Sequence, residues 1–269
     1  MSEHIKTPRY SFLIDASYCI DCRTCMVACS VENNVSMETT RIWIKETGVT
    51  GKFPNLERYT APYHCMHCFD PSCVSACTVG ALQRNEDGIV HYDQDICIGC
   101  RYCIYACPFG VPNYEWKEQF PLVVKCDMCM SRLGEGEQPA CAQTCPTGAI
   151  QFGKYEDMVE LAHKRINENP GKYVNHVYGE TENGGTATLY ISPVPFEELG
   201  FPNPETTSTA YFNRLVTEGT PMVAGAMLVG LSGAYLTIKH AREEAERDRL
   251  EADQEQAAVA AGEEMNHDE

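Results

Sequence analysis

The feature that most constrains this chain is a cysteine run from Cys97 to Pro108 with the spacing C-x2-C-x2-C-x3-C-P. Short loops with this spacing hold cubane 4Fe-4S clusters. Three thiolates separated by two residues can surround one face of a cluster, whereas Cys107 is carried past it and is placed to ligate a second cluster. The run therefore predicts a partner run elsewhere in the chain.

Three further cysteine runs are present. Cys19 to Cys29 repeats the same spacing, while Cys65 to Cys77 and Cys126 to Cys145 are split runs that share the frame P-x-C-x3-C-x2-G-A. The order long, split, long, split predicts two ferredoxin-like repeats, residues 10–91 and 92–152. Four runs of four thiols use all 16 cysteines, which is what four tetrathiolate clusters require. The sequence thus predicts four 4Fe-4S clusters.

Other uses of so many cysteines fit less well. A disulfide scaffold is typical of secreted chains much shorter than 269 residues. Structural zinc uses paired C-x2-C knuckles and has no need of a third cysteine two residues on. Covalent haem needs C-x2-C-H, which does not occur in the sequence. The net charge of -17 argues against nucleic acid, because no basic stripe is present to neutralise phosphates.

The runs also favour electron transfer over catalysis. A catalytic cluster needs an open iron position, whereas four thiolates per cluster leave none. His64 and His67 flank Cys65, and a histidine ligand is chemically reasonable. Because that run already supplies four thiols, we interpret both histidines as surface residues or neighbours of the ligands.

The expected fold class is α+β, with two ferredoxin-like repeats, short hairpins and helices, and a single C-terminal transmembrane helix. Residues 1–152 carry the repeats, beginning with a strand at 10–15 and including strands at 40–46 and 89–92. Residues 153–218 are expected to supply a helix at 154–169 that packs over the clusters, strands at 173–178 and 186–192, and a proline-rich linker at 193–204.

Gly219 to Ile238 is a stretch of twenty residues without a charge, long enough to cross a hydrocarbon layer of about 30 Å as a helix. Ala226, Gly230 and Ala234 form a stripe of small residues of the kind by which membrane helices approach a neighbour. The alternative is a buried helix of a soluble protein. Residues 239–269 form an acidic tail, with 4 Lys/Arg against 11 Asp/Glu.

Basic residues near this stretch predict its orientation. Within fifteen residues of its ends, Arg214 stands alone on the N-terminal side, and four basic residues lie on the C-terminal side: Lys239, Arg242, Arg247 and Arg249. The positive-inside rule then places the tail in the cytoplasm and the cluster domain on the periplasmic, extracytoplasmic face.

Together the four runs, the segment Gln138 to Ala149, the strand after Gly184 and the C-terminal membrane helix resemble a known family. They are similar to the beta subunit of nitrate-inducible formate dehydrogenase and to the electron-transfer subunit of membrane-bound uptake nickel–iron hydrogenase. Both belong to the wider four-cluster family of dimethyl sulfoxide reductase iron–sulfur subunits. The resemblance covers residues 11–239 and also implies four 4Fe-4S clusters.

The resemblance implies that the runs exchange ligands. The four implied sets are Cys19, Cys22, Cys25 and Cys145; Cys29, Cys126, Cys129 and Cys141; Cys65, Cys68, Cys73 and Cys107; and Cys77, Cys97, Cys100 and Cys103.

The implied function is that of a non-catalytic subunit of a respiratory oxidoreductase. It relays electrons between a catalytic subunit of hydrogenase or molybdopterin type and an integral membrane subunit that is quinone-linked or carries b-haem. Met1 to Ser17 contains neither a signal-peptide core nor an Arg-Arg pair, so we expect export together with a signal-bearing partner. The alternatives are a polyferredoxin that serves soluble enzymes, or the beta subunit of a polysulfide, dimethyl sulfoxide or nitrite reductase.

Overall fold

The computed structural model describes residues 7–117 and 121–265. By its internal contacts the chain divides into two compact units, Met1–Arg214 and Leu215–Glu269. The first unit contains all 16 cysteines. The second consists of most of one long helix.

The centre of the first unit is a three-stranded sheet of β1 (Tyr10–Asp15), β10 (Ile150–Lys154) and β11 (Thr188–Ile191), in the order β10-β1-β11. β1 occupies the expected range. It pairs antiparallel with β10 and parallel with β11. Because successive side chains of a strand face opposite sides, Phe12 and Ile14 join the cysteine-rich core, whereas Leu13 joins a second cluster on the other face. The pairing of β1 with β10 brings the first cysteine run to the fourth.

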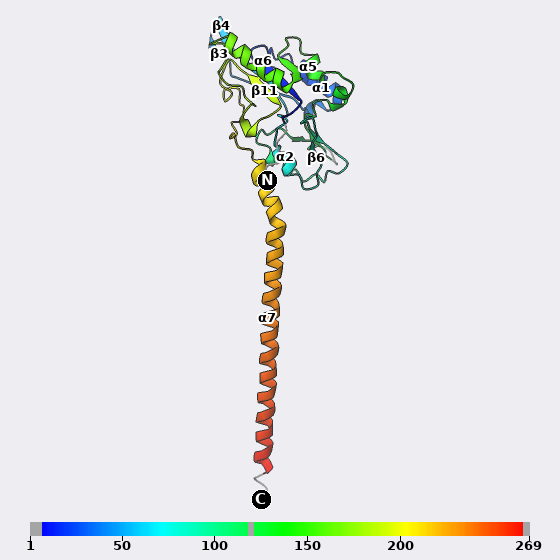
Figure 1. Cartoon of the computed structure of the whole chain (residues 1–269), viewed down its shortest axis with the longest axis vertical. Coiled ribbons are helices and arrows are strands. Elements are labelled where there is room, and N and C mark those ends of the chain that lie inside the picture. Colours follow the sequence, from blue (N-terminus) through cyan, green and yellow to red (C-terminus); the bar gives the residue numbers. More distant parts are fainter. Residues whose placement is uncertain (1–6, 118–120, 266–269) are drawn as a thin grey trace. The chain divides into compact units, whose positions relative to one another are not determined.

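Helix α6 (Tyr155–Glu168) covers the outer face of this sheet, as Figure 1 shows. Ala162 and Ile166 on its apolar side are buried against Leu13 and Leu189. The predicted helix is therefore present, but the expectation that it packs over the clusters is wrong. The strands lie between α6 and the cysteine core, because alternation along β1 gives each face of the sheet its own apolar surface.

The cysteine runs form short helices that pack in two pairs. α1 (Thr24–Asn33) of the first run packs against α5 (Ala140–Gln143) of the fourth, and α2 (Ser72–Ser75) of the second packs against α3 (Tyr102–Ala106) of the third. Figure 1 shows α1 beside α5 and, at another part of the unit, α2 beside β6. The two ferredoxin-like repeats are therefore interleaved in space.

Short hairpins connect these runs, which confirms the α+β class. The pairs are β2 (Trp43–Glu46) with β5 (Thr60–Tyr63), β3 (Thr50–Lys52) with β4 (Asn55–Glu57), β6 (Leu82–Arg84) with β7 (Val90–Tyr92), and β8 (Asn113–Tyr114) with β9 (Val123–Val124). The remaining short elements of this part are η1 (Met37–Thr39), α4 (Met130–Gly134) and η2 (Glu182–Gly184). The strands expected at 40–46 and 89–92 are thus found, but shorter.

Two expectations for the segment after α6 are wrong. Residues 173–178 were expected to form a strand, yet in the structure they make isolated hydrogen bonds to the edge of β11, at Val174 and Tyr178. The tight hydrogen bond from His176 N–H to the Val174 carbonyl at 2.7 Å bends the backbone between these two points, so a continuous ladder cannot form.

Residues 193–204 are not a linker. Phe196, Leu199 and Phe201 of this segment are buried in the main core, where the ring of Phe201 contacts Tyr178 and Tyr190. The prolines of this segment suggested a linker. In the structure they belong to a loop whose apolar side chains pack into the core.

Helix α7 (Ala210–Met265) contains the predicted membrane stretch but is longer than expected at both ends. It begins before Gly219 and extends through most of the acidic tail, so the boundaries at 219 and 238 mark a change of composition and not of structure. Within the described residues, α7 is the one helix long and apolar enough to cross a membrane, and none of its apolar window is buried by the protein. This exposure contradicts the alternative of a buried soluble helix.

Two threonine hydroxyl groups of α7 donate hydrogen bonds to carbonyl groups of the same helix. Thr220 donates to the Val216 carbonyl at 2.5 Å, and Thr237 donates to the Gly233 carbonyl at 2.9 Å. Such internal bonds suit a helix in hydrocarbon, where water cannot serve as a partner. Apolar side chains such as Met222 and Val229 are exposed on this helix.

Candidate metal centres

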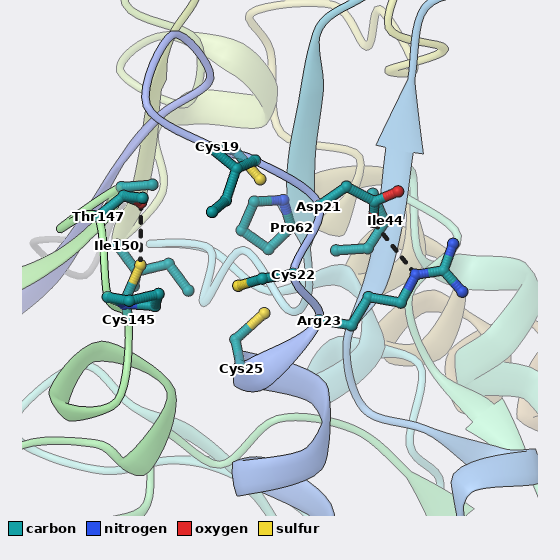
Figure 2. A pocket seen from close by; sticks show the side chains of 13 residues that line it. Cys19, Asp21, Cys22, Arg23, Cys25, Ile44, Pro62, Cys145, Thr147 and Ile150 are labelled. Carbon is teal, nitrogen blue, oxygen red and sulfur yellow. Dashed lines mark hydrogen bonds and ion pairs between the residues drawn. The ribbon is translucent and has the colours of Figure 1, made fainter.

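The structure gathers the 16 cysteines into four sets, which we call thiol groups 1 to 4. Group 1 comprises Cys19, Cys22, Cys25 and Cys145, which line one pocket. In Figure 2 the sulfurs of Cys19, Cys22 and Cys25 point toward one another, and Cys145 approaches from a different segment. Burial, together with the neighbouring thiolates of Cys19 and Cys145, raises the pKa of Cys25 to about 12.

Group 2 is built in the same way from the first and fourth runs. It comprises Cys29, Cys126, Cys129 and Cys141, all of them buried. The Nδ2 group of Asn33 donates to Cys29 Sγ at 3.6 Å and to Cys129 Sγ at 3.9 Å. Burial is the main reason that the pKa of Cys141 lies well above its ordinary value, and the thiolates of Cys129 and Cys29 add to the effect.

Groups 3 and 4 combine the second and third runs. Cys68 has Cys65, Cys73 and Cys107 as neighbours, and these four form group 3; Cys103 has Cys77, Cys97 and Cys100 as neighbours, and these four form group 4. Burial, followed by the thiolates of Cys107, Cys73 and Cys65, raises the pKa of Cys68 well above its ordinary value. Burial and the thiolates of Cys100, Cys77 and Cys97 raise the pKa of Cys103 to about 11.

The four groups form a row. Cys25 of group 1 acts electrostatically on Cys141 of group 2. Cys65 of group 3 acts on Cys126 of group 2, and Cys103 of group 4 acts on Cys73 of group 3. Each of these pairs joins groups that are neighbours in the order 1, 2, 3, 4.

Burial differs between the ends and the middle of this row. Group 1 contains the exposed Cys22, and group 4 contains the exposed Cys100. Groups 2 and 3 contain no exposed cysteine, and seven of their eight cysteines are buried. The row therefore has two ends that solvent reaches and a middle that is enclosed by protein.

The backbone of the four cysteine runs is suited to a cluster, because a cluster needs hydrogen-bond donors around its sulfurs. In every run the residue before the second cysteine has a left-handed conformation, with φ of 54° at Asp21, 46° at His67, 67° at Gly99 and 60° at Met128. Three of these residues are not glycine, so the backbone is strained there. Left-handed residues in short loops are typical of backbone nests, whose N–H groups can bind an anion.

Backbone donors already reach three of the sulfurs. Ala81 N–H donates to Cys77 Sγ at 3.2 Å, Met128 N–H to Cys126 Sγ at 3.3 Å, and Gly99 N–H to Cys97 Sγ at 3.4 Å. Among the described residues, no three His, Cys, Asp or Glu side chains lie close enough together to hold a single metal ion. Each group offers four thiols from two runs, which is the donor set that a 4Fe-4S cluster takes.

His64 and His67 are fully buried, which excludes the surface position for both. His64 Nδ1 donates to the Cys65 carbonyl at 3.0 Å, and His67 Nδ1 accepts from Val90 N–H at 3.1 Å. Burial lowers the pKa of His64 to about 4. Both rings are therefore part of the wall beside group 3.

Sequence reasoning missed three residues beside the thiol groups. The amide of Asn33 contacts group 2, as described above. Lys125 is 3% exposed, and its Nζ donates to the carbonyls of Val90 at 2.5 Å and Cys126 at 2.6 Å. The buried Asn183 lies near Cys68. No motif marks these positions; Lys125 directly precedes the fourth run, which is the one local hint.

The segment that leads into α7, and the start of that helix, are tied to the loop of group 3. Ser208 Oγ donates to the Asp70 carbonyl at 3.1 Å, and the hydroxyls of Ser72 and Thr209 are 2.5 Å apart. Arg214 forms an ion pair with the Asp70 carboxylate. All of these residues belong to the first unit, so the helix starts from the loop between Cys68 and Cys73.

Comparison with known proteins adds independent evidence. Residues 11–78 and 56–155 match two family models that are both described as a 4Fe-4S dicluster domain. The hydrogenase-2 operon protein HybA of Escherichia coli O157:H7 is 35% identical over 242 residues, which cover 73% of this chain and 74% of that protein.

Two subunits of Escherichia coli K12 are also similar. The iron–sulfur subunit of nitrate-inducible formate dehydrogenase is 38% identical over 200 residues, 66% of each protein. A subunit of anaerobic dimethyl sulfoxide reductase is 39% identical over 161 residues, which cover 56% of this chain and 77% of that subunit.

Proposed function

This chain belongs to the family of iron–sulfur subunits with 4Fe-4S dicluster domains that includes HybA and the formate dehydrogenase subunit, and from that premise we propose that it relays single electrons within a membrane-bound oxidoreductase. The proposed donor or acceptor at one end is a catalytic subunit of hydrogenase or molybdopterin type. At the other end we place an integral membrane subunit that is linked to quinone.

The observation that carries this proposal is the row of thiol groups with exposed ends and an enclosed middle. When bound, each cluster takes up and passes on one electron without a change in covalent bonds. The chain's own contribution is to hold successive sites in line, to exclude water from groups 2 and 3, and to admit partners at Cys22 and Cys100. A catalyst would instead need an open coordination position, whereas each group offers four thiols.

The proposed ligand sets are thiol groups 1 to 4, one 4Fe-4S cluster each. Support comes from the shared pocket of group 1 and from the mutual electrostatic influence of the thiols within each group. Since all four groups have four cysteines, the proposed total is four clusters.

We assign group 4 to the membrane end of the row. The segment that leads into α7 is bonded to the loop of group 3 through Ser208, and α2 in that loop packs against α3, which carries Cys103 of group 4. Exposed aromatic side chains lie around group 4 at Tyr102, Tyr105 and Trp116. Group 1, at the far end of the row, then faces the catalytic subunit.

For the membrane itself we propose that α7 crosses once, with the first unit on the extracytoplasmic face. The excess of basic residues after Ile238 supports this orientation. The apolar, exposed surface of α7 supports a lipid environment, because an exposed apolar helix is unfavourable in water.

The test is to purify the affinity-tagged chain anaerobically from membranes of its own organism. We expect detergent to be required, a large catalytic subunit to copurify, and the chain to carry about 16 iron and 16 sulfide. A colourless zinc protein would contradict the cluster assignment. Extraction without detergent, with no catalytic partner, would instead support the polyferredoxin function.

A further inference from the structure

Asn183 occupies a strained position beside the loop of group 3. It lies in η2 with φ of 52°, and its side chain is fully buried. The turn that contains it is tied to the group 3 loop, because Phe69 N–H donates to the Gly185 carbonyl at 3.0 Å. Gly185 itself has φ of 98°, and a Cβ there would come within 2.9 Å of the Phe69 ring. The turn is therefore pressed against the residue that follows Cys68.

Hydrogen bonds fix which way the Asn183 amide points. Its Oδ1 accepts from Thr209 N–H at 3.0 Å and from the Thr209 hydroxyl at 3.3 Å. Because a backbone N–H can only donate, the atom facing Thr209 must be the oxygen. The NH2 group consequently occupies the other side of the amide.

That NH2 group has no completed hydrogen bond within residues 7–117 and 121–265, although its nitrogen is buried. The turn that carries Asn183 lies directly beside Cys68, because Cys68 forms an isolated β-bridge with Thr186, shortly after Asn183 in the chain. An unpaired buried donor is unfavourable, so such a group normally has a partner in the assembled protein. A metal-bound thiolate is a stronger acceptor than a thiol, because charge-assisted hydrogen bonds are stronger than neutral ones.

We propose that Asn183 is a positioning residue of group 3: its NH2 donates to Cys68 Sγ once that sulfur is a cluster ligand, and so raises the reduction potential of this cluster. The inference rests on the proposed cluster at group 3. Reduction adds negative charge to the cluster and its ligands, and a donor aimed at a ligand sulfur stabilises that charge. Thr209, which directly precedes α7, holds the amide in this orientation.

The test uses the full chain with Asn183→Gly and Asn183→Asp, because glycine and aspartate both tolerate a left-handed backbone. Asn183→Gly removes the donor. Asn183→Asp keeps an oxygen for Thr209 but turns a second carboxylate oxygen toward Cys68. Redox titrations monitored by electron paramagnetic resonance should show one cluster shifted to a more negative potential, further in Asn183→Asp than in Asn183→Gly. The affected signal should be the one that Cys68→Ser alters.

The matched control is Asn33→Asp, because Asn33 donates to Cys29 and Cys129 of group 2. It should shift the signal that Cys126→Ser alters and leave that of group 3 in place. An unchanged potential of the group 3 signal in both Asn183 variants would overturn the inference. Loss of that signal from both variants, with the other three intact, would show that Asn183 holds the loop instead of tuning the cluster, and would also overturn it. A wild-type chain without iron would instead refute the proposed function.

Discussion

Asp70 and Arg214, 144 residues apart, form a two-pronged ion pair, with Nη1 2.6 Å from Oδ1 and Nη2 2.7 Å from Oδ2. The Asp70 side chain is 8% exposed, whereas that of Arg214 is 45% exposed. The pair joins the loop between Cys68 and Cys73 to the first turn of α7. It links the loop of thiol group 3 to the start of α7.

Replacing Arg214 should destabilise the protein more than replacing Asp70. Arg214→Met leaves a buried carboxylate without its two-pronged partner, which we expect to cost about 2–3 kcal/mol. Asp70→Asn leaves a cation that can turn to water, and we expect about 1 kcal/mol. The measurement is the rate at which the purified holoprotein loses its visible iron–sulfur absorbance at a fixed temperature, where about 1.4 kcal/mol corresponds to a tenfold change.

Arg9→Met is the control for this prediction. Arg9 pairs with Asp87 at 3.4 Å, and both side chains are well exposed, so its removal should change the rate by less than about threefold. Equal effects of Arg214→Met and Asp70→Asn would show that the burial of Asp70 does not decide the strength of the pair.

Ligand exchange between runs predicts which cysteine variants share a defect. Cys29→Ser and Cys126→Ser should lose or shift the same electron paramagnetic resonance signal, because both belong to group 2. Cys25→Ser and Cys145→Ser should share a different signal, that of group 1. If Cys29→Ser instead matched Cys25→Ser, each run would hold its own cluster and the proposed grouping would be wrong.

Lys125 should raise the potentials of the clusters in the middle of the row. Its ammonium is buried at the start of the fourth run, and it lowers the pKa of Cys73 in group 3 against the larger raising effect of burial. A unit charge about 10 Å away, at an effective dielectric constant of about 20, contributes about 1.7 kcal/mol, or roughly 70 mV for one electron. Redox titration of Lys125→Gln, which keeps a donor but loses the charge, should therefore show a negative shift of this order.

Lys117→Gln provides the comparison for Lys125. Lys117 forms an exposed ion pair with Glu38 at 2.7 Å, and solvent and salt screen such charges. We expect all four potentials to stay at their wild-type values in this variant. Shifts of similar size in the two lysine variants would mean that overall charge, and not the buried position of Lys125, sets the potential.

The orientation of the chain can be checked by proteolysis. Protease added to right-side-out spheroplasts should digest the first unit and spare a tag placed after Glu269, because four basic residues follow the membrane stretch and one precedes it. Protection of the first unit, with digestion of the tag, would place the cluster domain in the cytoplasm.

The sequence by itself determined the features that depend only on residues close together in the chain. Two-residue spacing places three thiols on one short loop whatever the rest of the chain does, so the four runs were visible at once. The uncharged stretch from Gly219 to Ile238 likewise needs no tertiary contact to be recognised, since length and hydropathy are enough. The strand Tyr10 to Asp15 and the helix after Lys154 followed from periodicity.

Tertiary structure decided how these parts combine. The fourth member of each thiol group comes from a distant run, and the sheet pairing of Tyr10 with Lys154 brings the first run to the fourth. The spacing of the long runs predicted that their fourth cysteine ligates a second cluster, whereas the choice of partner run was implied by a family resemblance. The predicted strand at 173–178 failed for a related reason: β11 pairs with β1 along one edge, and a bend in the backbone interrupts the ladder at the other.

The buried polar residues around the thiols were beyond the reach of sequence reasoning. The turn of Asn183 lies beside Cys68 although more than a hundred residues separate them in the chain, and Lys125 binds the carbonyl of Val90 across the unit. Their roles depend on which polar groups are buried next to them and need a hydrogen-bond partner once the chain has folded. The spacing of residues along the chain does not predict this environment. The environment forms only when the two interleaved repeats pack around the row of thiols.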